Sequence, residues 1–170
     1  MLVTGASAHR LEEYLQATRI LVSTNRVELF IELTPGVAVA GQVVAVMDTD
    51  DDGVISNEEG AAYARRMLED ISVELDGKSL AVTEMGTFIP AVSDMKTGSG
   101  VIRIRAAGSI APLKDGKHMI ALTNAHLTSI SVYVVNALVP KDPAIKITRQ
   151  VRDETQMDYR LEFVSDASLP

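Results

Sequence analysis

Residues 27–34 read VELFIELT, and aliphatic side chains occupy every second position of this stretch. The alternation predicts a half-buried β-strand, because successive side chains of a strand point to opposite faces of the sheet. The preceding run, residues 15–22, is expected to pair with it through a turn at residues 23–26. Residues 35–36, Pro-Gly, would end this hairpin.

Further short strands are predicted along the rest of the chain. Residues 71–75 and 79–82 flank Asp76-Gly77, which is a strong two-residue hairpin signal. The other predicted strands are residues 101–106, 117–124, 130–139, 145–152 and 158–164. Residues 130–139 are almost continuously apolar, which favours a central position in a sheet. Many short strands separated by turn residues are typical of an antiparallel β-sandwich.

A second signal lies between the first hairpin and these strands, where residues 48–59 read DTDDDGVISNEE. The EF-hand calcium loop has oxygen ligands at positions 1, 3, 5, 7, 9 and 12, with glycine at position 6. Gly53 falls at position 6 of this stretch. The predicted calcium ligands are Asp48, Asp50, Asp52, the carbonyl of Val54, Ser56 and Glu59. An acidic surface loop is the alternative interpretation, but it does not require this joint pattern.

Helices are predicted on both sides of the loop, because apolar residues recur there at helical spacing. They are Val39, Val43, Val44 and Met47 before the loop, and Ala64, Met67, Leu68 and Ile71 after it. Ser56 and Glu59 also form a capping box, so Glu59 is expected to cap the helix without metal and to turn to the ion when calcium binds. The all-oxygen ligand set favours calcium over magnesium, and zinc or copper would require thiolates or histidines.

The composition argues against several classes of function. The formal net charge is −7, and nothing in the sequence would follow a phosphate backbone, so nucleic-acid binding is not expected. The chain contains no cysteine, which excludes disulfides and thiol catalysis. No apolar run is long enough to span a membrane. Because no nucleophile elbow, phosphate-binding loop or zinc-protease motif occurs, we do not expect an enzyme.

The start of the chain carries a possible export signal. Residues 6–8, Ala-Ser-Ala, match the small-x-small pattern that signal peptidase cuts after, so residues 1–8 would be a signal-peptide remnant, or else a disordered start. Cleavage after Ala8 would leave His9 at the N-terminus, and cleavage after Ala6 would place it third. Both arrangements chelate copper or nickel. His118 or His126 could complete such a site, although scattered histidines are more often surface residues.

The chain resembles a group of exported bacterial proteins. Residues 8–17, AHRLEEYLQA, are similar to the mature start of that group. There an early hairpin ending in Leu-Thr-Pro-Gly, here residues 33–36, leads into one EF-hand, and an Asn-Ala-Leu-Val-Pro strand end, here residues 136–140, follows. The resemblance runs from residue 8 to about residue 164, and it implies export and a calcium-binding β-domain, with no particular reaction.

More distantly, the chain is similar to the extracytoplasmic segment of bacterial nickel/cobalt permease relatives. Those proteins begin with a mature Ala-His and a β-rich domain with an acidic loop. This chain departs from them at Arg10, where they tend to have proline, and in having no membrane segment.

These observations predict a mainly β (α+β) fold, namely an antiparallel β-sandwich with an inserted helix–loop–helix EF-hand. Residues 9–164 would form one domain, with the EF-hand at about residues 37–72 and residues 165–170 as a tail or linker. The leading hypothesis is a calcium-binding scaffold or binding module, periplasmic or secreted, whose single EF-hand stabilises the sandwich. The alternative is an accessory nickel-, cobalt- or copper-handling domain of a permease system that uses histidines. The partner would be another protein, with a membrane protein as one candidate.

Overall fold

The first hairpin of the structure is the one that the sequence predicts. The structure is a computed structural model, and it describes residues 12–166. Strand β1 (Tyr14–Ser23) pairs antiparallel with β2 (Arg26–Pro35) along the whole length of both strands. The aliphatic residues of the alternating stretch are Val27, Leu29, Ile31 and Leu33, and all are at most 1% exposed. The alternation therefore marks one buried face, as expected.

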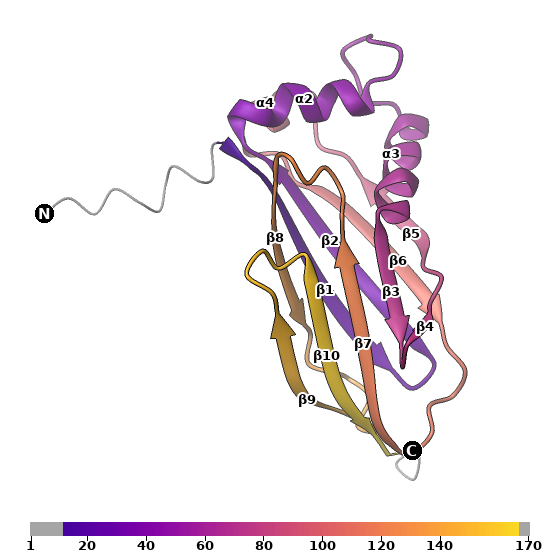
Figure 1. Ribbon diagram of the computed structural model, residues 1–170. Helices are drawn as coiled ribbons and strands as arrows, with labels where there is room; N and C mark the ends of the chain where they lie inside the picture. Colours follow the sequence, from indigo (N-terminus) through magenta and orange to yellow (C-terminus); the bar gives the residue numbers. More distant parts are fainter. Residues whose placement is uncertain (1–11, 167–170) are drawn as a thin grey trace, which may run out of the picture.

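Two five-stranded sheets form the β part of the structure (Figure 1). The first has the order β5–β6–β2–β1–β8, with β5 at Thr83–Phe88, β6 at Ile102–Ser109 and β8 at Ser131–Ala137. The second has the order β4–β3–β7–β10–β9, with β4 at Lys78–Ser79, β3 at Ile71–Leu75, β7 at Gly116–Asn124, β10 at Asp158–Ser165 and β9 at Ile145–Arg152. Buried side chains of both sheets belong to one hydrophobic core, so the predicted sandwich-like arrangement is confirmed.

Three short helices lie together at one end of the sheets, which we call the helical end (Figure 1). They are α2 (Val37–Met47), α3 (Asn57–Glu69) and α4 (Val92–Lys96). Helices α2 and α3 follow β2 and precede β3, where the helical periodicity predicts them, except that Ile71 of the predicted stripe is the first residue of β3 because α3 ends at Glu69. Tyr63, Ala64 and Met67 of α3 are at most 3% exposed, so this helix is part of the core.

Turns and loops form the opposite end of the sheets, which we call the distal end (Figure 1). It comprises the connections at residues 24–25, 76–77, 110–115 and 138–144. Two of these connections are bonded to each other, because the backbone N–H and the hydroxyl of Thr24 both donate to the Asp142 carboxylate, at 3.1 and 3.0 Å. The distal end is therefore a defined surface built from several parts of the chain.

The placement of β8 corrects two predictions. Strand β8 pairs with β1 in parallel, so the first sheet is not wholly antiparallel. The long connection from β1 to β8 permits this, since only short hairpin loops force antiparallel pairing. Strand β8 is also an edge strand, although its apolar sequence predicts a central one. Side chains of β9 cover its edge: Gln150 accepts from the Ala137 N–H at 3.1 Å, and Arg152 Nε donates to the Val135 carbonyl at 2.8 Å.

Three further elements differ from the sequence prediction. The strand expected at residues 79–82 is only the two-residue β4, and neither β5 nor α4 is predicted. Strand β5 is an edge strand with most of its side chains exposed, and its register shifts between Glu84 and Gly86. A strand without one continuous buried face has no period-two pattern to detect.

Candidate metal centre

Three aspartates gather in the loop of residues 48–56, which connects α2 to α3 and which we call the acidic loop. One carboxylate oxygen from each of Asp48, Asp50 and Asp52 lies within 4.8 Å of the other two. An ion bound at 2.3–2.6 Å from each oxygen requires oxygens no more than about 5 Å apart. The spacing therefore fits one ion held by all three carboxylates.

Backbone amides of the acidic loop hold these carboxylates in place. The N–H groups of Asp52 and Gly53 donate to the two oxygens of Asp48 at 3.1 and 2.9 Å, and the Val54 N–H donates to Asp52 at 2.8 Å. The chain reaches this geometry through left-handed backbone at Asp51 (φ 58°) and Gly53 (φ 83°). Glycine adopts such angles without a Cβ penalty, which explains why it occupies this position.

The carboxylates of the acidic loop repel one another. Asp50 accepts a backbone hydrogen bond from Asp52 that alone would lower its pKa. Partial desolvation and the charges of Asp52, Glu59 and Asp48 oppose this, and the net effect is a raised pKa of Asp50. A cation placed among these groups would remove the repulsion.

Glu59 lies in a separate arrangement at the start of α3. Its carboxylate accepts from the N–H and hydroxyl of Thr49 at 2.6 and 2.8 Å, and from the N–H and hydroxyl of Ser56 at 2.9 Å each. The Glu59 N–H donates back to the Ser56 hydroxyl at 3.2 Å, which completes the predicted capping box. The bonds from Ser56, and then those from Thr49, lower the pKa of Glu59 to about 2.

The six predicted ligands therefore divide into two sets. The structure brings Asp48, Asp50 and Asp52 together, whereas Ser56 and Glu59 bond to each other and Val54 has a side chain 63% exposed. Sequence reasoning missed Thr49, which binds Glu59 through both its N–H and its hydroxyl. A hydroxyl residue at the second position of the loop is the signal that could have identified it.

The histidines of the described residues do not form a common site. His118 lies near the start of β7 and His126 lies just beyond its end, so the length of a strand separates them. Both ring nitrogens of His118 are engaged, with the Asp76 carboxylate at 2.7 Å and the Lys114 carbonyl at 2.8 Å. The ring nitrogens of His126 are engaged with Asp70 and Tyr63. His9 lies outside the described residues.

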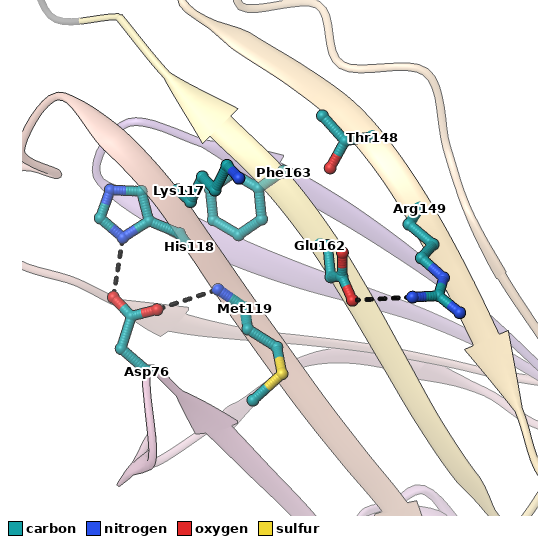
Figure 2. A pocket seen from close by; sticks show the side chains of 8 residues that line it. All are labelled: Asp76, Lys117, His118, Met119, Thr148, Arg149, Glu162 and Phe163. Atoms are coloured by element: carbon teal, nitrogen blue, oxygen red, sulfur yellow. Dashed lines mark hydrogen bonds and ion pairs between the residues drawn. The ribbon is translucent and has the colours of Figure 1, made fainter.

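A surface hollow of about 630 Å³ lies away from the acidic loop, on β7, β10 and β9 (Figure 2). It is lined by Asp76, Lys117, His118, Met119, Thr148, Arg149, Glu162 and Phe163. Four of its charged or titratable groups pair with one another, since Asp76 binds His118 and Glu162 lies 3.9 Å from Arg149, whereas Lys117 takes part in no ion pair between residues 12 and 166. Pairing of this kind is what a solvated sheet surface shows, and no nucleophile–base pair stands out among these residues.

Comparison with protein-family models and with curated proteins found no match for this chain. Among residues 12–166, no helix is both long and apolar enough to cross a membrane. The candidate function therefore follows from the acidic loop, whose three aspartates can hold a metal ion.

Proposed function

We propose that this chain is a calcium-binding module in which residues 48–59 act as an EF-hand loop and the two sheets act as a scaffold or binding domain. The observation that carries the proposal is the convergence of Asp48, Asp50 and Asp52 on a volume of the size of one ion. The loop sequence adds the glycine and the closing glutamate that such a loop requires. The donors are all oxygens, which supports calcium over zinc or copper.

Glu59 would be the ligand that responds to the ion. In the structure its carboxylate forms the capping box of α3 with Ser56 and binds Thr49. Calcium would replace some of these hydrogen bonds by coordination to both carboxylate oxygens. Binding would then tie the acidic loop directly to the first turn of α3.

Stabilisation of the fold is the consequence that we propose for calcium binding. Helix α3 starts at the acidic loop and buries Tyr63, Ala64 and Met67 in the core. An ion that binds only the folded state stabilises it by about 2.7 kcal/mol at a concentration of 100 times Kd. For a chain of this size that corresponds to a Tm increase of roughly 5–10 °C.

Thermal unfolding with and without calcium tests this function. We expect the Tm of chelator-treated protein to rise when millimolar calcium is added, and Asp48→Asn or Glu59→Gln to remove most of the rise. Asp51→Asn is the matched control, because Asp51 carries the same charge in the same loop but lies at a non-ligand position. Absence of a shift in the unmodified protein, or equal loss in the control, would contradict calcium binding by these ligands.

Export is a further part of the proposal. The resemblance of residues 8–17 to exported proteins supports it, and millimolar external calcium would fill a single weak loop. The alternative of a nickel-, cobalt- or copper-handling domain would depend on His9, because His118 and His126 have engaged ring nitrogens and lie a strand length apart. Calorimetric titration with nickel of a chain cut before His9 would decide whether that residue binds a transition metal.

A further inference from the structure

Lysine is distributed very unevenly over the molecule. The chain has six lysines, and five of them lie in the connections of the distal end or within two residues of them, away from the acidic loop. They are Lys78 after the β3–β4 turn, Lys114 before β7, Lys117 at the start of β7, Lys141 between β8 and β9, and Lys146 at the start of β9. Lys117 and Lys146 both pair with Val164 of β10, so they share one face of the second sheet.

The five lysines form no close ion pair within the described part of the chain, although the charge of Lys78 helps to lower the pKa of the neighbouring Asp76. All five are exposed, and none of them takes part in an ion pair between residues 12 and 166, where arginines and histidines make such pairs. Two aspartates of the distal end accept hydrogen bonds: Asp76 accepts from His118 and from the Met119 N–H, and Asp142 accepts from Thr24. Asp115 and Asp166 have interactions of their own. These hydrogen bonds leave the aspartates negatively charged, because they outweigh the partial desolvation of Asp76 and lower the pKa of Asp76 and of Asp142. The lysines of this end outnumber its aspartates five to four, and their longer side chains carry the charge farther from the backbone.

The acidic loop is too far away to cancel this charge. It lies beyond the helical end, and the nine residues of β7 alone span roughly 30 Å between the two ends. The Debye length at physiological ionic strength is about 8 Å. A charged surface that meets the distal end would therefore respond to the lysines, although the chain as a whole has a formal net charge of −7.

An exposed apolar side chain accompanies the lysines. Val139 is 86% exposed, the highest value among the exposed large hydrophobic residues of the described chain, and it lies two residues before Lys141. An apolar side chain surrounded by lysines suits the boundary between lipid headgroups and acyl chains. There Val139 would enter the interface, while the lysine ammonium groups would remain beside the phosphates. Single-stranded nucleic acid would instead call for stacking platforms, and the aromatic ring nearest to this end, Phe163, is fully buried.

We propose that the distal end is a docking surface for a membrane that exposes anionic phospholipids. Lys78, Lys114, Lys117, Lys141 and Lys146 supply electrostatic attraction, and Val139 inserts at the headgroup level. Each lysine near an anionic surface contributes a factor of about five in affinity, so the contribution grows steeply with their number. Docking in this orientation directs the acidic loop away from the membrane and leaves it open to the solution.

Vesicle co-sedimentation in the presence of a chelator, which prevents calcium from bridging protein and lipid, tests this surface. We expect the protein to bind phosphatidylglycerol-containing vesicles at low salt, to bind neutral phosphatidylcholine vesicles at least tenfold more weakly, and to be released by 0.5 M salt. Lys→Gln substitution of all five lysines should weaken binding at least tenfold, and Val139→Ser by roughly threefold.

A second variant tests whether binding depends on where the positive charges lie or only on how many there are. Replacement of five exposed cationic residues towards the helical end by glutamine gives the same net charge and should leave vesicle binding within twofold. These residues are Arg65, Arg66, Lys96, Arg103 and Arg160. Equal loss in both variants, or no binding to anionic vesicles at low salt, would overturn the proposal. Tighter binding to duplex DNA or polyglutamate at equal charge concentration would also overturn it, in favour of a nucleic acid or an acidic protein. The result does not depend on the calcium loop.

Discussion

At the scale of single residues, Thr49 would control how readily Glu59 reaches the ion in the proposed calcium loop. Its N–H and hydroxyl hold one carboxylate oxygen of Glu59 at 2.6 and 2.8 Å, while Ser56 holds the other. In the proposed calcium loop, an ion bound to both oxygens of Glu59 would compete with the bonds from Thr49 to one oxygen and with those from Ser56 to the other. The hydroxyl of Thr49 would therefore stabilise the observed position of Glu59 and oppose coordination of the ion.

Removal of that hydroxyl should tighten calcium binding. We expect Thr49→Val to lower the Kd for calcium roughly two- to fivefold, the equivalent of one exposed hydrogen bond, and to lower the metal-free Tm. Thr87→Val is the matched control, because the Thr87 hydroxyl donates to the Glu84 carboxylate at the same distance, 2.8 Å, outside the loop. Competition with a fluorescent chelator measures both affinities, and weaker calcium binding by Thr49→Val would show that the hydroxyl assists the ion.

At the scale of secondary-structure elements, α3 is joined to β1 and to the loop between β7 and β8 by a buried chain of hydrogen bonds. The Tyr63 hydroxyl lies 2.7 Å from that of Tyr14 on β1 and 3.0 Å from Nε2 of His126, and His126 Nδ1 lies 2.7 Å from Asp70 at the end of α3. Tyr14, Tyr63 and His126 are at most 3% exposed. Burial of polar groups is tolerated here because each has a partner.

Loss of the Tyr63 hydroxyl should therefore be costly. Tyr63→Phe keeps the ring but leaves the hydroxyl of Tyr14 and Nε2 of His126 without a partner, so we expect the free energy of unfolding to fall by about 1–3 kcal/mol. Tyr159→Phe is the control: its hydroxyl donates to Gln150 at 2.7 Å, and the exposed Gln150 can turn to water. Urea unfolding in chelator measures both changes, and a larger loss in the control would contradict this account.

Elements with one buried face were predictable, and elements whose environment depends on distant strands were not. The β1–β2 hairpin and the helices beside the acidic loop follow local periodicity, so the strand predicted at residues 27–34 and the helices predicted on both sides of the loop are confirmed. Strand β8 was misplaced because its apolar run predicts burial on both faces, whereas at the edge of the sheet only Tyr133 and Val135 are buried. Strand β5 was missed because its side chains are mostly exposed.

The candidate site shows the same division. The spacing of Asp48, Asp50 and Asp52 is a local property, and the structure brings these three together as their positions predict. The capping box of Ser56 and Glu59 is local as well. The buried network around His126 joins residues more than fifty positions apart, and no sequence period announces such contacts.

At the scale of the whole molecule, the two described histidines should give stability an optimum in pH. Burial lowers the pKa of His126 below its ordinary value of 6.5, although the hydrogen bond to Asp70 opposes this. Burial alone would also lower the pKa of His118, but its bonds to Asp76 and to the Lys114 carbonyl outweigh burial and raise it above 6.5. The folded state therefore favours the neutral form of His126 and the charged form of His118.

The two histidines therefore destabilise the fold on opposite sides of pH 6.5. A lowered pKa means that the unfolded chain binds the proton more readily, so the contribution of His126 is complete above 6.5 and is lost as pH falls towards its folded pKa. A raised pKa means the reverse, so the contribution of His118 is complete below 6.5 and is lost as pH rises through its folded pKa.

Urea unfolding between pH 5 and 8.5 should consequently show maximal stability near 6.5, with His118→Gln flattening only the alkaline limb. His126→Gln should flatten the acid limb. Because His126 is only 1% exposed, its substitution also disturbs the packing around it. NMR titration of both imidazoles in the unmodified protein therefore supplies an independent measurement. We expect His118 to titrate above 6.5 and His126 below it. If both imidazoles titrated on the same side of pH 6.5, the surroundings of one histidine would not shift its pKa in the direction that we expect, and this explanation of the pH optimum would be wrong.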